Sequence, residues 1–109
     1  MSNTSRREKL EAMLVDEPTD TFLRYSLAME FGKEERFDES FQIFAELTSE
    51  SPPHVPAFLM AGQQFARLGR VEEARDVLRE GIEAARGQND SHAAAEMSEF
   101  LVSLGAAGE

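Results

Sequence analysis

The feature that most constrains this chain is an internal repeat with an offset of 34 residues. The segment at 32–40 (GKEERFDES) and the segment at 66–74 (ARLGRVEEA) both place a small turn before one apolar residue, two acids and a small residue. A fixed period of about 20 to 50 residues is typical of a stack of one supersecondary unit. We therefore expect two copies of such a unit. The same offset pairs further residues of like character: Leu27-Ala28 with Ala61-Gly62, Phe31 with Phe65, and Phe44 with Leu78.

The segments between the turns have the spacing of amphipathic helices. Leu23, Leu27 and Phe31 fall at i, i+4 and i+8, which is one face of a helix that Thr19 or Asp20 can cap. Nothing alternates with period two, so we expect no strands. The apolar positions of the three helices that follow are, in order, Phe37, Phe41, Phe44 and Leu47; Phe58, Ala61, Gly62 and Phe65; and Val71, Ala74, Val77, Leu78 and Ile82.

A 34-residue unit of two antiparallel helices resembles the tetratricopeptide repeat (TPR). Small residues recur in that pattern because two helices cross at about 8 Å only where Gly, Ala or Ser leaves room. Two positions depart from it: Arg24 stands where the family prefers a large aromatic residue, and Leu47 stands where it prefers alanine. The matching positions are Leu27-Ala28, Phe31, Ser40, Phe44 and Pro52 in the first unit, and Phe58, Ala61-Gly62, Phe65, Gly69, Ala74, Leu78 and Gly81 in the second.

The resemblance implies an all-α fold, a right-handed α-solenoid of antiparallel helix pairs with two full TPR units and flanking helices. We expect a single TPR domain over residues 1–109. The last helix echoes the repeat at an offset of 36, because Leu104-Gly105 matches Leu68-Gly69. The expected parts are an N-terminal helix or half repeat at 5–18, repeat one at 20–53, repeat two at 54–87 and a C-terminal capping helix at 90–105.

Composition argues against catalysis. The chain has no cysteine, and its two histidines, His54 and His92, lie far apart, so we expect neither a disulfide nor a metal site. Acidic pairs such as Glu72-Glu73 lie at expected helix starts, where they complement the helix dipole. The sequence contains no phosphate-binding loop and no Ser-His-Asp arrangement. We therefore predict no enzymatic activity and no cofactor.

Net charge and hydropathy argue against nucleic-acid and membrane partners and indicate where in the cell the protein is expected. The chain carries 21 acidic and 11 basic residues, a net charge of −10, and such a field repels nucleic acid and anionic membranes. No run approaches the ~20 apolar residues that a membrane helix needs, and the start reads as no secretion signal, so we predict a cytoplasmic protein. An acidic surface with two lysines fits a salt-adapted cytoplasm and fits ordinary solubility equally well.

One helical face, offset from the packing face, carries the candidate binding residues. In the TPR family this face of the first helix of each repeat lines a concave groove, so the resemblance implies a protein or peptide partner of unknown identity. The alternative is a self-associating structural module, in which the terminal helices or the groove form a homodimer. A flanking helix or a second copy of the chain can also cover the candidate face. The family's lysine and asparagine carboxylate clamp is not expected, since Tyr25 and Met29 occupy its positions. The candidate partner-binding residues are Phe22, Tyr25 and Met29 in the first repeat and Leu59, Gln63 and Arg67 in the second.

Overall fold

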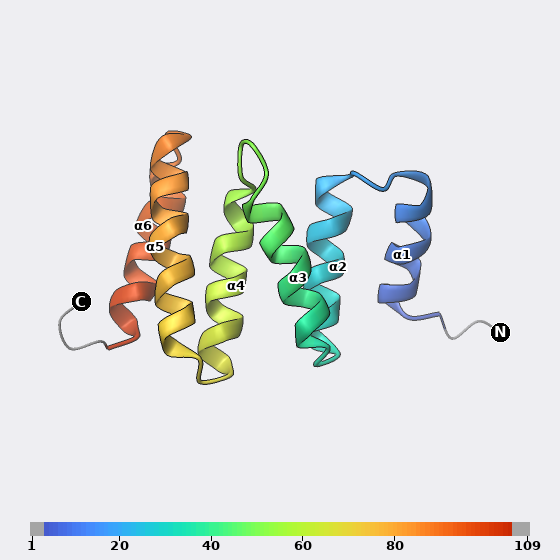
Figure 1. Cartoon of the computed structure of the whole chain (residues 1–109), viewed down its shortest axis with the longest axis horizontal. Coiled ribbons are helices and arrows are strands. Elements are labelled where there is room, and N and C mark those ends of the chain that lie inside the picture. The colour runs from blue at the N-terminus through green and yellow to red at the C-terminus, as the bar shows by residue number, and fades with distance from the viewer. Residues whose placement is uncertain (1–3, 106–109) are drawn as a thin grey trace. The chain divides into compact units, whose positions relative to one another are not determined.

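The computed structural model describes residues 4–105, which form six α-helices and no strand (Figure 1). This confirms the all-α fold class. The chain divides into two compact units, residues 1–50 and 51–109, so the division falls close to the boundary expected between the repeats. A single domain over 1–109 stays a prediction, and residues 1–3 and 106–109 lie outside the described range. The helices are α1 (Arg6–Asp16), α2 (Thr21–Lys33), α3 (Phe37–Thr48), α4 (Val55–Arg67), α5 (Val71–Gly87) and α6 (Ser91–Ser103).

In the first unit, α2 packs against α1 on one side and α3 on the other. Two small residues meet between α2 and α3: Ala28 and Ser40 are fully buried, and the Ser40 hydroxyl donates a hydrogen bond of 2.7 Å to the Ala28 carbonyl. Phe44 and Leu47 of α3 are buried as well. The buried cluster between α1 and α2 consists of Leu10, Leu23, Leu27 and Phe31, with Leu14 and Ile43 packed beside it.

In the second unit, α5 lies between α4 and α6, and α6 also contacts α4. Two glycines allow the helices to cross closely. A Cβ on Gly62 would lie 2.8 Å from Leu78 Cδ2, and one on Gly81 would lie 2.5 Å from Phe58 Cβ. The core of this unit consists of Val55, Phe58, Leu78, Ile82, Ala85, Ala94 and Met97.

Three of the helices are capped at their N-terminus by a side chain that accepts a hydrogen bond from a free backbone amide. Ser5 accepts from the Glu8 amide while the Glu8 carboxylate accepts from the Ser5 amide, a reciprocal pair at the start of α1. This hydrogen bond from the Ser5 backbone, with that from its hydroxyl, lowers the pKa of Glu8. Asp20 accepts from the Leu23 amide at 2.8 Å, and Asp90 caps α6 in the same way. Of the two candidate caps for α2, Asp20 therefore serves.

The turn inside each repeat is built in the same way, 34 residues apart. The Arg36 guanidinium lies over the Phe31 ring, 4.8 Å from its centroid, and binds the Glu39 carboxylate. Arg70 lies 4.9 Å from the Phe65 centroid and binds Glu73 in the same manner. Each arginine amide also donates to the carbonyl of that aromatic residue at 2.9 Å. The matching contacts show that the two turns are equivalent positions of one repeat.

Candidate functional site

The α2 face predicted to bind a partner combines exposed and packed side chains. Phe22 is 70% exposed, which is unusual for a large aromatic residue. Met29 is half-buried. The Tyr25 ring packs against the Phe44 ring of α3, with centroids 6.3 Å apart and planes tilted by 60°, and burial raises the pKa of its phenol. Tyr25 therefore serves the packing of the first unit as well as its surface.

The α4 residues of the predicted face differ among themselves in the same way. Leu59 is half-buried and packs against the core of the second unit. Gln63 is half-buried, and Arg67, at the end of the helix, is exposed. Two of the six predicted binding residues, Tyr25 and Leu59, therefore also contribute to packing within their units.

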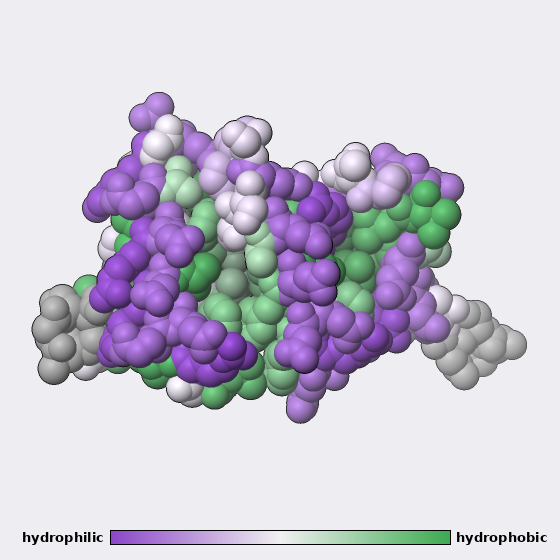
Figure 2. Space-filling view, viewed as in Figure 1, coloured by the Kyte–Doolittle hydropathy of each residue, from purple (hydrophilic) through white to green (hydrophobic). Residues whose placement is uncertain are grey.

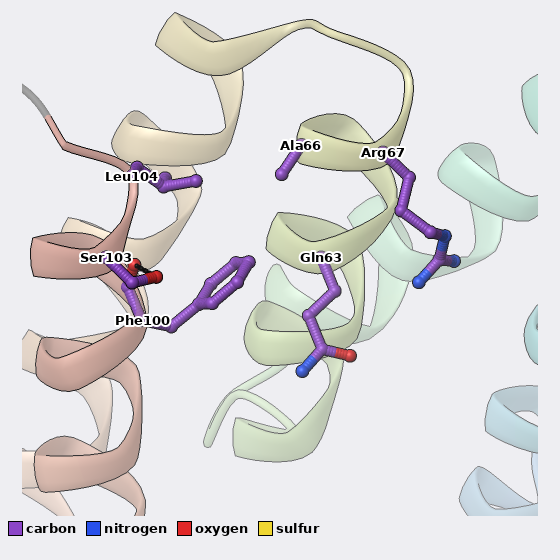
Figure 3. A pocket seen from close by; sticks show the side chains of 6 residues that line it. All are labelled: Gln63, Ala66, Arg67, Phe100, Ser103 and Leu104. Atoms are coloured by element: carbon purple, nitrogen blue, oxygen red, sulfur yellow. Dashed lines mark hydrogen bonds between the residues drawn. The ribbon is translucent and has the colours of Figure 1, made fainter.

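An open groove of about 450 Å³ lies between α4 and α6 within the second unit. Figure 3 shows the Phe100 ring reaching from α6 toward α4, while Gln63 stands at the side and Arg67 extends away from α6. The Ser103 hydroxyl donates to the Phe100 carbonyl at 2.6 Å, so it is satisfied within its own helix. The structure therefore brings Gln63 and Arg67 to one groove. Its lining residues are Gln63, Ala66, Arg67, Phe100, Ser103 and Leu104.

Sequence reasoning did not include the α6 side of this groove, because α6 was expected to be only a cap. Ala94 and Met97 are indeed buried against the rest of the unit. Phe100 and Leu104 also pack partly against the core, yet both line the groove. A signal was available: Phe100 and Leu104 fall at i and i+4, a second apolar stripe beside the packing stripe of Met97 and Leu101.

Almost every basic side chain of residues 4–105 is used in an ion pair. Nine of the 11 Lys and Arg residues contact a carboxylate, usually three or four positions away on their own helix. Lys33, for example, lies 3.1 Å from Glu30. In the described part of the chain, only Lys9 and Arg67 have no such carboxylate partner. Arg67 is therefore the uncommitted positive charge of the second unit.

Arg24, which departs from the family pattern, has a defined role in the first unit. Its side chain is only 18% exposed and contacts Glu50, with Glu46 of α3 at 3.5 Å. The hydrogen bond that the guanidinium donates to the Glu50 carboxylate raises the pKa of Arg24. Where the family pattern places an aromatic contact between the two helices, this chain has a partly buried ion pair.

The acidic pair Glu72-Glu73 lies in the first turn of α5, where a helix start was expected, and each carboxylate contacts a nearby arginine. Glu73 is exposed, and its hydrogen bond from Arg70 lowers its pKa. Within residues 4–105 no group of three or more His, Cys, Asp or Glu side chains is arranged to hold a metal ion. In the same range, no helix has the length and apolar character needed to cross a membrane. The hydrophilic side chains that cover much of α3 and α5 are visible in Figure 2.

Helical hairpins that pack through small residues, with equivalent turns 34 residues apart, define a helical-repeat protein, and comparison with solved structures gives its family. An NMR structure of a tetratricopeptide repeat domain protein from Salinibacter ruber shares 30% identity, covers 80% of this chain and 88% of its own, and has a TM-score of 0.74. A crystal structure of a tetratricopeptide repeat domain protein from the same organism shares 29% identity, covers 78% and 94%, and has a TM-score of 0.68.

A solution structure of a protein from Bordetella parapertussis shares 26% identity, covers 96% of this chain and 90% of its own, and has a TM-score of 0.78. No family model and no curated protein matches the sequence. The chain belongs to the tetratricopeptide repeat family. Its fold is that of a protein-interaction module, and its structural neighbours point to a repeat fold without catalysis.

Proposed function

We propose that this protein binds a protein or peptide partner through the predicted face of α2 and α4, and that it acts by binding rather than by catalysis. The face comprises Phe22, Tyr25 and Met29 on α2 and Leu59, Gln63 and Arg67 on α4. The observation that carries the proposal is the open groove beside α4, which Gln63 and Arg67 line. Exposed Phe22 supports it, because a large aromatic side chain left in water is a typical anchor for a partner. A cytoplasmic location stays a prediction.

Capture of partners from a native cell lysate tests this proposal with variants that do not disturb the packing. Tyr25 and Leu59 are poor choices, because each also packs within its unit. We expect Phe22→Ala combined with Gln63→Ala to reduce capture at least tenfold, since interface anchors commonly contribute about 2 kcal/mol or more. Helicity and melting temperature should stay close to those of the parent protein.

The matched control is Val15→Ala, which shortens a side chain that is 79% exposed and belongs to α1 rather than to α2 or α4. It should leave capture unchanged. If the double variant stays folded and captures as much as the parent, binding does not use this face. Equal loss in the control and in the double variant would likewise exclude a specific role for α2 and α4.

Self-association is the alternative, and an exposed apolar patch on α1 favours it. Figure 2 shows apolar surface over the C-terminal part of α1, where Met13 is 47% exposed and Val15 is 79% exposed. Light scattering coupled to size exclusion gives the mass directly. A mass of 12.2 kDa indicates the monomer that the binding proposal expects. Twice that mass, returning to one copy in Val15→Asp, would assign the patch to a homodimer.

A further inference from the structure

The groove between α4 and α6 offers an apolar floor at its α6 side. Phe100 extends from α6 into the space, and Ala66 and Leu104 lie on either side of its open end (Figure 3). Both Phe100 and Leu104 are anchored by partial packing against the core of the unit. An apolar surface that is held in place loses little entropy when a ligand side chain covers it. The volume of about 450 Å³ is at the lower end of that of small-molecule sites, and fits a few amino-acid side chains.

The rim of the same groove carries a positive charge that pairs with no carboxylate among the described residues. Arg67 makes no ion pair within residues 4–105, although acidic residues outnumber basic ones by 21 to 11. Its guanidinium is exposed and extends away from α6. An arginine without a partner is free to change rotamer, and its planar donors match a carboxylate in two parallel hydrogen bonds.

We propose that the α4–α6 groove is a self-contained site for a short peptide segment with an apolar side chain next to a carboxylate. The apolar side chain covers Phe100 and Leu104, and the carboxylate pairs with Arg67. This inference rests on the proposed function, but it moves the anchor to α6 and gives the partner a chemical class. Arg67 selects the carboxylate by its charge, and the apolar floor of Phe100 and Leu104 selects the apolar side chain.

The net charge of the protein limits how acidic the segment can be. A field from −10 repels a polyacidic peptide before it reaches the groove. The bound segment therefore carries one carboxylate at the position of Arg67, and its flanking residues are neutral or basic. A basic flank also gains from the long-range attraction, which increases the association rate and weakens as salt is added.

The test begins with a random heptapeptide library displayed on phage and selected on the whole protein. We expect the enriched peptides to combine one Asp or Glu with a neighbouring Leu, Ile, Met or Phe, in a neutral or basic context. Two synthetic peptides are then made from the strongest sequence, one with its carboxylate and one with the matching amide. Their affinities are measured by fluorescence anisotropy for the parent protein and its variants.

Arg67→Gln should weaken binding of the carboxylate peptide roughly two- to fivefold, as for an exposed ion pair, and leave binding of the amide peptide unchanged. The control Lys9→Gln removes the other basic side chain of residues 4–105 that lacks an ion pair; it lies on α1, and its loss should change neither affinity. Ala66→Leu fills the groove without removing any packing and should weaken both peptides at least tenfold. Arg67→Lys should keep the preference for the carboxylate at reduced strength.

The outcomes separate this inference from the proposed function. Enriched peptides without an acid, or equal weakening of both peptides by Arg67→Gln, would overturn the carboxylate assignment. Peptides that lose binding in Phe22→Ala but not in Ala66→Leu would overturn the α4–α6 site and support the α2 face. A library without any enriched peptide would count against peptide binding itself, and so against both.

Discussion

A side chain at Gly81 should destabilise the protein more than one at the other glycine of the same helix, Gly87. An added Cβ would lie 2.5 Å from Phe58 Cβ and 2.6 Å from Met97 Sδ, well inside the ~3.5 to 4.0 Å of ordinary carbon contacts. The Met97 thioether is flexible, but Phe58 Cβ is fixed to the backbone of α4. For Gly81→Ala, α5 must therefore move away from α4. Overpacking of this kind costs about 1 to 3 kcal/mol, and the upper half of that range applies here.

The higher helix propensity of alanine stabilises the variant and partly offsets the cost of the clash. A second glycine-to-alanine variant in the same helix, without a clash, measures this gain. Alanine stabilises a helix interior by up to about 1 kcal/mol relative to glycine. Gly87 is the last residue of the same helix, and a Cβ added there would have no atom within 4 Å. Gly87→Ala should therefore gain stability from helix propensity without a clash. The difference in unfolding free energy between the two variants should be about 2 to 3 kcal/mol.

Thermal and urea denaturation followed by circular dichroism measure this difference. At about 4 to 8 °C per kcal/mol for a domain of this size, Gly81→Ala should melt roughly 10 °C or more below Gly87→Ala. Gly87→Ala should melt at or slightly above the parent protein. Equal stability of Gly81→Ala and Gly87→Ala would mean that α4 and α5 do not cross closely at Gly81.

Three further results are expected. Glu35 has φ = 60° where the second repeat has Gly69 at φ = 76°, so Glu35→Gly should raise the unfolding free energy by about 0.5 to 1 kcal/mol, and a lower midpoint in urea would contradict this. Tyr25 is the only tyrosine and burial raises its pKa, so its absorbance near 295 nm should titrate above the ordinary value of about 10; the stability it contributes is present below that value and lost as pH rises through the folded-state pKa. The net charge of −10 predicts a melting temperature that rises between 0.05 and roughly 1 M potassium chloride, as repulsion is screened, and a flat or falling curve would favour ordinary solubility over salt adaptation.

Most of the fold could be predicted because the repeat signal and the helix physics agree. The 34-residue offset fixed which residues are equivalent, and Ser40 and Ala74 are both fully buried. The start of α4 at Val55 was also predictable, because Pro56 follows it. Proline is tolerated in the first turn of a helix, where its missing N–H would have no partner within the helix. The contact of the Arg36 guanidinium with the Phe31 ring could not be foreseen from periodicity, since it depends on the geometry of the turn.

The candidate site was less predictable, because exposure depends on neighbours that the helical pattern does not specify. Periodicity placed Tyr25 outside the packing stripe of α2, yet its ring contacts Phe44 of the next helix. It also assigned α6 a capping role, since one stripe of that helix is enough to cover the core. The availability of Arg67 depends on where every other charge finds a partner, which only the three-dimensional arrangement decides.

Gly81→Ala also tests how the two units share stability. The core cluster around Phe58 and Met97 comes from α4–α6, and that around Leu27 comes from α1 and α2 with Ile43 of α3 packed beside it. In a repeat protein, stability is a sum of unit and neighbour terms, so a clash inside one unit mainly destabilises that unit. A loss of about 2 kcal/mol should raise hydrogen exchange of protected α4–α6 amides roughly thirtyfold and change α2 amides by less than about threefold. Equal acceleration in α2 and α5 would instead mean that the chain unfolds as the single domain that its sequence predicts.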